Sequence, residues 1–396
     1  MFMSFEPGAP APADFIALCA PAIRGNEWAY IKECLDSSYV SSVGPFVDRF
    51  EIALAKYVEA RHAVATSSGT AALHIALLVA GVQPDDEVLV STLTFIAPVN
   101  TIRYVGAWPI FIDAEPDYWQ MDPEKVVAFL DRECKWHNGE LRNKTTGRRV
   151  SAILPVHILG HPVDMDTILE AARKYNLIVI EDATESLGAK YKGRMVGTLG
   201  DIACFSFNGN KIITTGGGGM IVTDNEAWAC KAKYLTTQAK DDPIEFIHNE
   251  IGYNYRLTNI QAAMGVAQLE KLDEYIAIKR QIANNYANAF KDVPGLTPMR
   301  EAEWAFSILW MYTILIDGAR YGMDSRALMD SLEAQKIQTR PLWKPIHKNM
   351  PYLKCQNYHC SIAEKLNRCA LSLPCSVGLS FVDQQRVINC IQSLQK

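Results

Sequence analysis

Residues 202 to 224 read IACFSFNGNKIITTGGGGMIVTD, and this stretch indicates how the chain folds. Its two apolar runs, IACFSF and GMIVTD, are continuous rather than alternating, which is typical of strands covered on both faces. The loop between them carries Lys211 and then four glycines at 216 to 219. A polar side chain that follows a buried strand is a candidate for chemistry, because functional groups of α/β sheets gather where strands end.

The same pattern of a short apolar run followed by a helical stretch repeats from about residue 60 to about residue 225. The other runs are HAVATS (62–67), EVLVSTLT (87–94), WPIFIDA (108–114), SAILPVHI (151–158) and LIVIEDA (177–183). Alternation of apolar runs with helices favours an α/β fold, with a mainly parallel sheet between helices.

The pattern changes beyond about residue 258. A long helical stretch at 259–290 is followed by WMYTILI (310–316) and by helical patterns near 324–336 and 381–394. We therefore predict a large domain over residues 1–257, which includes an N-terminal segment, and a smaller α+β domain over 258–396 with the connecting helix. The polar, basic segment 132–149 predicts an excursion on the surface of the large domain.

The composition excludes several classes of protein. A formal net charge of -5, without a Lys/Arg-rich run, argues against a nucleic-acid partner. No apolar stretch reaches the roughly 18 residues of a membrane span, and the N-terminus lacks a basic segment followed by an apolar run, so we expect a cytoplasmic protein. Ten scattered cysteines without a CxxC pair predict reduced thiols and no metal site.

A first candidate site lies in SSGTAALHIALLVAG (67–81), where a strand ends in Ser-Gly-Thr and an apolar helix begins. A helix N-terminus offers unpaired N–H groups and partial positive charge, and Gly69 lets a phosphate approach the backbone. Thr70 and Ala71 are then the expected phosphate contacts. The alternative is that the serine or threonine simply caps a buried helix.

Two further candidates also follow buried strands. Asp182 ends LIVIED, where a carboxylate is costly unless it meets a cation or good hydrogen-bond donors. Lys211 follows the strand IACFSF, and burial lowers the pKa of a lysine, which frees its amine for attack on an aldehyde. Taken singly, both residues fit structural roles. In combination, however, a phosphate-binding turn, an acid for the ring nitrogen and a lysine that forms an imine are the three groups that pyridoxal 5′-phosphate requires.

With these residues in place, the sequence resembles the DegT/DnrJ/EryC1/StrS family of nucleotide-sugar aminotransferases from about Gly25 to the C-terminus. The resemblance implies the aspartate aminotransferase-like fold (fold type I of pyridoxal 5′-phosphate enzymes) and a role in cell-surface polysaccharide biosynthesis. The motifs that carry it are GNEWAYIKECLDSSYVSSVG, SSGTAALHIAL, TFIAPVNTI, PVHILGHPVDMD, EDATESLGA, FSFNGNKIITTGGGG, GYNYRLTNIQAA and PLWKPIHKNMPY.

The resemblance also implies roles for individual residues. Lys211 is expected to form the Schiff base with the cofactor, and Asp182 to hold the pyridinium nitrogen. Phe95 is expected to stack on the ring. Around the phosphate the family implies Thr70, Ala71 and Ser206 beside Gly69, and Asn254 of the GYNYRL motif reaching across a homodimer whose active sites are shared.

Two positions depart from the family pattern. Glu185 stands where the family commonly has Gln or His, a position expected to bond the phenolic oxygen of the cofactor. An ionised Glu185 would repel a phenolate, so it must share a proton or turn away. Gly217 stands where the family often has Glu. His157 and His161 also lie at a strand end, where a hydrogen-bonded core histidine is the simpler interpretation.

The resemblance implies transfer of an amine from L-glutamate to a keto sugar linked to a nucleotide, with Lys211 moving the proton. Arg256, Arg340, Lys344 and His347, together with Lys348, are the candidate substrate-binding residues. The motifs resemble most the branch that aminates C4 of UDP-4-keto-6-deoxy-N-acetylhexosamines on the route to bacillosamine or legionaminic acid. GDP-4-keto-6-deoxymannose, which gives perosamine, is the alternative substrate.

Two other classes remain as alternatives. A nicotinamide-dependent oxidoreductase would place a Gly-rich turn before the helix that follows the first strand, whereas GGGG here leads into the strand MIVTD. A noncatalytic regulator on the same fold would leave Lys211 without a purpose.

Overall fold

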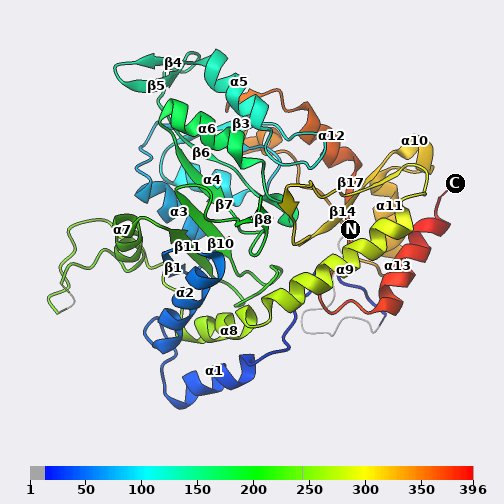
Figure 1. The fold of residues 1–396 in the computed structure, drawn as a ribbon, viewed down its shortest axis with the longest axis horizontal. Coiled ribbons are helices and arrows are strands. Elements are labelled where there is room, and N and C mark those ends of the chain that lie inside the picture. The colour runs from blue at the N-terminus through cyan, green and yellow to red at the C-terminus, as the bar shows by residue number, and fades with distance from the viewer. Residues whose placement is uncertain (1–13, 243, 396) are drawn as a thin grey trace.

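The computed structural model describes residues 14–242 and 244–395 (Figure 1). Residues 1–13 of the predicted large domain, Pro243 and Lys396 lie outside the described residues. One large sheet with surrounding helices forms most of the molecule, and a second, smaller sheet with helices lies at the other end of a long diagonal helix, α9 (Figure 1).

The large sheet has eight strands in the order β1-β11-β10-β7-β6-β2-β3-β16. β11 runs antiparallel to both β1 and β10, whereas the pairs from β10 through β16 are parallel. The strands are β1 (His62–Thr66), β2 (Glu87–Ser91), β3 (Trp108–Ile112), β6 (Val150–Leu154), β7 (Ile178–Asp182), β10 (Ile202–Ser206), β11 (Gly219–Thr223) and β16 (Asn357–Tyr358). The predicted mainly parallel sheet is confirmed.

Helices cover both faces of this sheet. Every residue of β2 and of β11 is buried, and successive side chains of a strand point to opposite faces, so neither face is open to solvent there. α3 is buried along almost its whole length, where it packs on β10 and β11. The helices of this part are α1 (Glu27–Asp36), α2 (Pro45–Val58), α3 (Gly69–Val79), α4 (Ala97–Tyr104), α5 (Pro123–Glu133), α6 (Met165–Tyr175) and α7 (Glu226–Thr236).

The predicted helix over 259–290 is two helices, α8 (Asn259–Leu269) and α9 (Leu272–Phe290). α8 packs against α1 and α2, and α9 continues to the small sheet, whose order is β12-β14-β17-β15 (Figure 1). The elements there are β12 (Leu296–Pro298), β14 (Tyr312–Ile316), β15 (Arg340–Pro341), β17 (Ala370–Leu373), α10 (Gly318–Tyr321), α11 (Ser325–Ala334), α12 (Ser361–Cys369) and α13 (Phe381–Ser393).

The chain beyond residue 257 also contributes to the large sheet, because β16 pairs with β3 at its edge. The division at residues 257 and 258 stays a prediction. The segment 132–149 forms a hairpin of β4 (Cys134–His137) and β5 (Glu140–Asn143) that projects at one end of the molecule (Figure 1). A three-stranded sheet joins β8 (Lys190–Tyr191), β9 (Arg194–Met195) and β13 (Ala305–Phe306).

The strands of the large sheet start within one residue of the predicted apolar runs but end one to several residues earlier, as β2 does at Ser91 rather than at Thr94. The residues at and after the ends of β1, β2, β6, β7 and β10 form much of the wall of the cavity described below. Among residues 14–242 and 244–395, no helix combines the length and the apolar character needed to span a bilayer.

Glu181 anchors the end of β7, the strand that carries Asp182. Its carboxylate is fully buried and accepts hydrogen bonds from the N–H groups of Gly197 (2.9 Å), Leu199 (2.7 Å) and Gly200 (2.6 Å). The His157 ring contributes a fourth contact at 3.0 Å. Burial alone would raise the pKa of Glu181. The hydrogen bonds from these donors, above all from His157, outweigh burial and hold this pKa below its usual value.

We expect Glu181→Gln to lower the free energy of unfolding by about 2–4 kcal/mol, because an amide cannot accept all four hydrogen bonds. Urea unfolding at neutral pH, followed by circular dichroism, measures the change. The depressed pKa means that the ionised carboxylate stabilises the fold above its ordinary pKa and that this stabilisation is lost as pH falls.

The difference between wild type and variant should therefore shrink below about pH 4. Asp36→Asn is the matched control: its carboxylate pairs with Lys32 on the surface, so the change should stay within about 0.5 kcal/mol. Equal stability of Glu181→Gln and wild type at neutral pH would contradict this role of Glu181.

Candidate active site

A cavity of about 380 Å³ lies at the carboxyl ends of the parallel strands. It receives residues that follow β1, β2, β6, β7 and β10, together with two tryptophans from the part of the chain beyond residue 257. The residues that line it are Ser68, Gly69, Thr70, Leu73, Thr94, Phe95, Ala97, Pro98, Val156, Asp182, Thr184, Glu185, Ser206, Asn208, Asn210, Lys211, Gly217, Gly218, Trp310 and Trp343.

Seven of the residues singled out from the sequence meet in this cavity. They come from segments far apart in the chain and are Gly69, Thr70, Phe95, Asp182, Glu185, Ser206 and Lys211. Phe95 keeps 55% of its surface exposed, so its ring is available to a ligand rather than packed in the core. The remaining predicted residues, Ala71, Asn254, Arg256, Arg340, Lys344 and His347, are not part of this wall.

The first turn of α3 forms one end of the cavity. Ser68 caps the helix by accepting a hydrogen bond from the Ala71 N–H at 3.0 Å, so the Ala71 N–H is already used within the turn. The N–H groups of Gly69 and Thr70 belong to the same first turn, where the helix itself provides no acceptors. This end of the cavity suits an anion such as a phosphate.

Gly69 is required here by space rather than by backbone conformation. A Cβ atom at this position would lie 2.8 Å from the Ser206 Cβ and 3.1 Å from the Ser206 Oγ. Glycine thus lets the start of α3 approach the end of β10, so that Ser206 and the helix N-terminus line the same end of the cavity.

Lys211 lies between a carboxylate and an aromatic ring. Its Nζ is 3.3 Å from the Glu185 Oε1 and 4.2 Å from the centre of the Trp310 ring. The other carboxylate oxygen of Glu185 accepts a hydrogen bond from the Leu159 N–H at 2.9 Å, which fixes the carboxylate beside the amine. The lysine amine is thereby held over the cavity by partners on two sides.

Asp182 is a second buried carboxylate in the same wall, with 2% of its surface exposed. Its Oδ1 accepts a hydrogen bond from the Thr184 N–H at 3.0 Å. Burial raises the pKa of Asp182, although Thr184 and the more distant Lys211 oppose the shift. A cationic ligand atom beside Asp182 would compensate the buried charge.

Burial also raises the pKa of Glu185, and the positive charge of Lys211 only partly opposes this. Among the described residues that line the cavity, two carboxylates therefore face a single lysine. A raised pKa makes a shared proton on Glu185 accessible, which is one of the two arrangements that the sequence left open for this residue.

Sequence reasoning did not assign Trp310, Trp343, Thr94 or Val156 to the site. Trp310 opens the predicted strand WMYTILI, and Trp343 lies in the motif PLWKPIHKNMPY, but an aromatic residue in either context is equally consistent with core packing. Only the fold brings these tryptophans to the strand ends of the large sheet.

The candidate substrate-binding residues lie outside the cavity wall. His347 is buried, with Nδ1 2.7 Å from the Thr92 Oγ1 and Nε2 3.2 Å from the Glu364 Oε1. It would have to release one of these contacts to bind a sugar hydroxyl. Arg340 donates to the Thr339 carbonyl, and Lys344 is exposed.

The two histidines at the end of β6 are hydrogen-bonded core residues, as expected. The Nδ1 of His157 accepts a hydrogen bond from the Val163 N–H at 2.9 Å, so its Nε2 carries the proton toward Glu181. Burial lowers the pKa of His161 to about 4, and the Ala302 N–H donates to its Nε2 at 3.1 Å.

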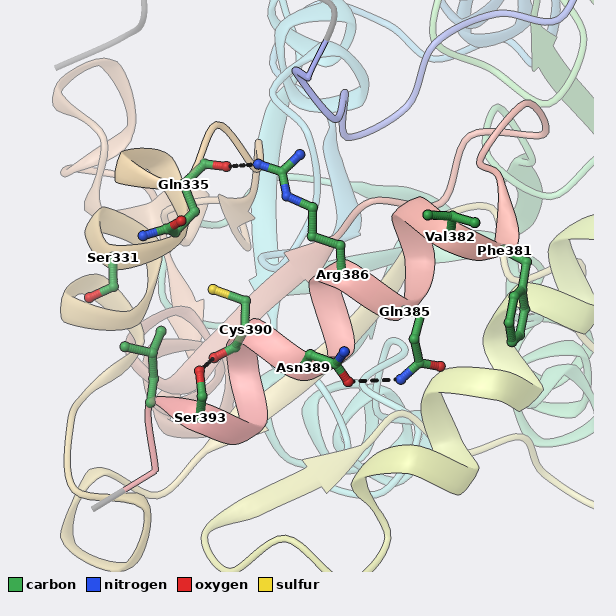
Figure 2. A pocket seen from close by; sticks show the side chains of 10 residues that line it. Ser331, Gln335, Phe381, Val382, Gln385, Arg386, Asn389, Cys390 and Ser393 are labelled. Atoms are coloured by element: carbon green, nitrogen blue, oxygen red, sulfur yellow. Dashed lines mark hydrogen bonds between the residues drawn. The ribbon is translucent and has the colours of Figure 1, made fainter.

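A second hollow, of about 750 Å³, lies between α11 and α13 (Figure 2). Its walls include Phe381 and Val382, and Arg386 points across it toward the Gln335 carbonyl (Figure 2). Arg386 also donates to the Asp14 carbonyl at 2.6 Å. Because this cation already donates to two carbonyl groups and no carboxylate is found among the described residues that line the hollow, the smaller cavity at the strand ends is the candidate active site.

Known proteins resemble this chain over almost its whole length. The model of the DegT/DnrJ/EryC1/StrS aminotransferase family matches residues 21–392. The GDP-perosamine synthase of Caulobacter vibrioides is 40% identical over 380 residues, which covers 96% of this chain and 98% of that protein. The GDP-perosamine synthase of Escherichia coli O157:H7 is 40% identical over 383 residues, with coverage of 96% and 98%.

Among solved structures, the Helicobacter pylori aminotransferase PseC, involved in the biosynthesis of pseudoaminic acid, superposes with a TM-score of 0.86. It is 25% identical, and the match covers 96% of this chain and 99% of PseC. The fold similarity thus extends over both the large sheet and the smaller C-terminal sheet.

We expect Gly69→Ala to weaken binding of pyridoxal 5′-phosphate by roughly ten-fold or more, because the new methyl group forces Ser206 and the start of α3 apart. Titration of the apoprotein, followed by the absorbance of the bound ligand, measures the dissociation constant.

Gly209→Ala is the matched control. Gly209 lies in the loop between Ser206 and Lys211, and a Cβ atom there would meet no heavy atom within 4 Å. Its dissociation constant should equal that of wild type. If both variants bind the ligand like wild type, α3 does not form the phosphate end of the site.

Proposed function

We propose that this chain, which belongs to the DegT/DnrJ/EryC1/StrS aminotransferase family, transfers an amine from L-glutamate to the 4-keto carbon of GDP-linked 4-keto-6-deoxymannose. The chain is a pyridoxal 5′-phosphate-dependent sugar aminotransferase. The observation that carries its chemistry is the meeting of Lys211, Asp182 and the first turn of α3 in one cavity.

The family assignment confirms several predictions made from the sequence. The fold is that of the fold type I enzymes, and the cofactor is pyridoxal 5′-phosphate. The nicotinamide-dependent oxidoreductase and the noncatalytic regulator are left without support. The finer assignment to the UDP-4-keto-6-deoxy-N-acetylhexosamine branch is not confirmed.

The residues in the cavity fit this cofactor. Gly69 lets Ser206 and the start of α3 line the end of the cavity where a phosphate would bind, and the buried Asp182 makes no ion pair with the described residues, so that a protonated ring nitrogen would supply its cation. Bound there, the cofactor supplies an electron sink for the carbon that gains or loses the amine. We propose Thr70 and Ser206 as phosphate contacts, Phe95 as the stacking residue and Lys211 as the covalent attachment.

Lys211 is also the proposed acid and base. With the cofactor held in this cavity, the Lys211 Nζ would be available to accept or return the proton at the carbon that gains or loses the amine. Glu185 and Trp310 hold this amine from two sides, at 3.3 Å and 4.2 Å, so proton transfer does not depend on a mobile side chain. The raised pKa of Glu185 lets its carboxyl group share a proton with a nearby oxygen of the ligand.

The choice of sugar rests on the relatives. Two GDP-perosamine synthases are each 40% identical to this chain over almost their whole length. Their names favour the GDP-linked substrate, which was the alternative at the level of sequence motifs, over the UDP-linked N-acetylhexosamine. We therefore propose the GDP-linked sugar as the substrate.

The anionic diphosphate of the substrate requires cations to bind it. Lys211 is the cation among the described residues of the cavity wall, and it takes part in the reaction, so these cations must come from outside the wall. We propose that Arg256, Arg340 and Lys344 serve this role at the entrance, with His347 near the sugar. Asn254 is exposed and outside the cavity of its own chain, which fits a contact made to the cofactor phosphate of a partner subunit.

The first test compares sugars. Enzyme charged with amine by L-glutamate should lose it to GDP-4-keto-6-deoxymannose at least about 100-fold faster than to pyruvate, because remote contacts to the nucleotide position the reacting carbon. A spectrophotometric half-reaction over GDP-, UDP- and dTDP-linked keto sugars measures the rates.

Faster discharge by the UDP-linked N-acetylhexosamine would overturn the choice of nucleotide and leave the aminotransferase activity in place. Discharge by a simple keto acid in preference to all nucleotide sugars would remove the sugar assignment for this chain.

The second test concerns the proposed homodimer. We expect Lys211→Ala and Asn254→Ala subunits, each with little activity alone, to regain about a quarter of wild-type activity when mixed in equal amounts. Half of the dimers are then hybrids, and one site of each hybrid has both residues intact if they come from different subunits. Activity is measured after subunit exchange has been verified by mass spectrometry.

Asn249→Ala is the control, since Asn249 is an exposed asparagine nearby on the same surface segment. It should remain active by itself. No recovered activity in a mixture that has exchanged subunits would show that Asn254 does not act across the interface.

A further inference from the structure

A buried lysine lies between two cysteines behind the active-site cavity. Lys279 belongs to α9 and has 2% of its surface exposed. Its Nζ lies 3.6 Å from the Cys19 Sγ, 3.6 Å from the Cys375 Sγ and 2.7 Å from the Trp310 carbonyl oxygen. Three N–H donors therefore meet three acceptors, and none of these acceptors is a carboxylate.

A buried ammonium group without a counter-charge is strongly unfavourable. The two sulfurs are the groups in contact with Lys279 that can become anions, so either the lysine is neutral or one cysteine is a thiolate. Burial opposes a charged lysine, but the facing cysteine sulfurs outweigh it and raise the pKa of Lys279. The ammonium form is thus paired with a thiolate.

The two cysteines are not equivalent. Cys19 is half-buried, while Cys375 has 1% of its surface exposed. A hydrogen bond from Cys375, assisted by the charge of Lys279 and, more weakly, of Lys211, lowers the pKa of Cys19 to about 6. The same hydrogen bond raises the pKa of Cys375 well above its usual value. Cys19 is therefore the thiolate, and Cys375 is the thiol that donates to it.

The backbone already holds these residues side by side. The Cys375 N–H donates to the Leu18 carbonyl at 2.8 Å, and the Ala20 N–H donates to the Ser376 Oγ at 2.8 Å. The segments that carry the two cysteines are thus adjacent, which a disulfide between them requires. In the structure none of the ten cysteines is part of a disulfide.

We propose that Cys19 and Cys375 form an oxidation site that reacts with hydroperoxides, with Lys279 as the cation that activates Cys19. The Cys19 thiolate attacks the terminal oxygen of the peroxide, an S–O bond forms, the O–O bond breaks, and the leaving hydroxide or alkoxide takes a proton from solvent to become water or an alcohol. The Cys375 sulfur then attacks the Cys19 sulfur, the S–S bond forms and a water leaves. The two sulfurs together lose two electrons, which the peroxide gains.

This site is connected to the catalytic lysine. When Cys19 is protonated, its Sγ donates a hydrogen bond at 3.3 Å to the carbonyl oxygen of Asn210, the residue before Lys211. The Trp310 indole N–H donates to that same carbonyl at 2.8 Å, and the Trp310 ring faces the Lys211 Nζ. Cys19 therefore contacts the residue next to Lys211, the proposed attachment point of the cofactor. The oxidation of Cys19 itself does not require the sugar substrate.

Treatment of the holoenzyme with hydrogen peroxide, followed by alkylation and peptide mapping without reductant, tests the proposal. We expect a peptide pair joined through Cys19 and Cys375, reversed by dithiothreitol. In Cys375→Ser the second step is removed, so Cys19 should instead accumulate as the sulfenic acid and be labelled by dimedone. Cys230→Ser, which removes an exposed cysteine of α7, is the control and should form the link like wild type.

The pH dependence of Cys19 alkylation isolates the role of Lys279. The rate in wild type should rise with a midpoint near pH 6. In Lys279→Met the midpoint should rise toward the ordinary thiol value, because the positive charge of Lys279 is lost while the hydrogen bond from Cys375 remains. If Lys279→Met does not fold, the dimedone experiment on Cys375→Ser tests the proposal instead: label on Cys19 supports it, and no label on Cys19 contradicts it. A wild-type midpoint near the ordinary thiol value, or peroxide oxidation that leaves Cys19 and Cys375 unlinked, would overturn the proposal.

Discussion

Charges buried at the ends of parallel strands are the constraint on which the site depends. Asp182 and Glu185 are both almost fully buried, and a carboxylate in such a place requires donors or cations. Among the described residues of the cavity wall the available cation is Lys211, so the wall carries one more acid than base. A ligand with a cationic ring nitrogen near Asp182 and an anionic group at the start of α3 matches this distribution of charge. Glu181, one residue earlier on β7, shows the contrasting solution, because its carboxylate is satisfied within the protein by three N–H groups and His157.

Close approach of backbone segments positions the groups that meet this ligand. Glycines at the start of β11 and at the start of α3 let these two elements and the end of β10 touch. A Cβ atom on Gly219 would lie 2.5 Å from the carbonyl carbon of Ser68, and one on Gly69 would clash with Ser206. The helix N-terminus is therefore pressed against two strands, and its unpaired N–H groups face the same cavity as the lysine. The shape of the cofactor site thus depends on the glycines at positions 69 and 219 as much as on its reactive side chains.

The part of the chain beyond residue 257 completes the site rather than merely adjoining it. Trp310 and Trp343 close the cavity, and the Trp310 ring lies over the Lys211 Nζ. The Trp310 carbonyl also accepts a hydrogen bond from Lys279, which links the cavity to the pair Cys19 and Cys375. Lys279 belongs to α9, the helix that extends from the large sheet toward the small one (Figure 1). A displacement of α9 can accordingly shift Trp310 through its hydrogen bond with Lys279, and Trp310 contacts the Lys211 amine.

The sequence by itself determined the chemistry and the strand pattern. Continuous apolar runs located the strands of the large sheet, and Gly69, Asp182 and Lys211 could be recognised because each lies at the end of such a run or shortly after it. It did not determine the break between α8 and α9, the partners of Glu185, or the presence of Trp310 and Trp343 in the cavity. Those features depend on contacts between segments that are separated along the chain, such as Lys211 with Trp310. Local patterns report burial and periodicity along one segment, whereas only the tertiary structure decides which segments meet.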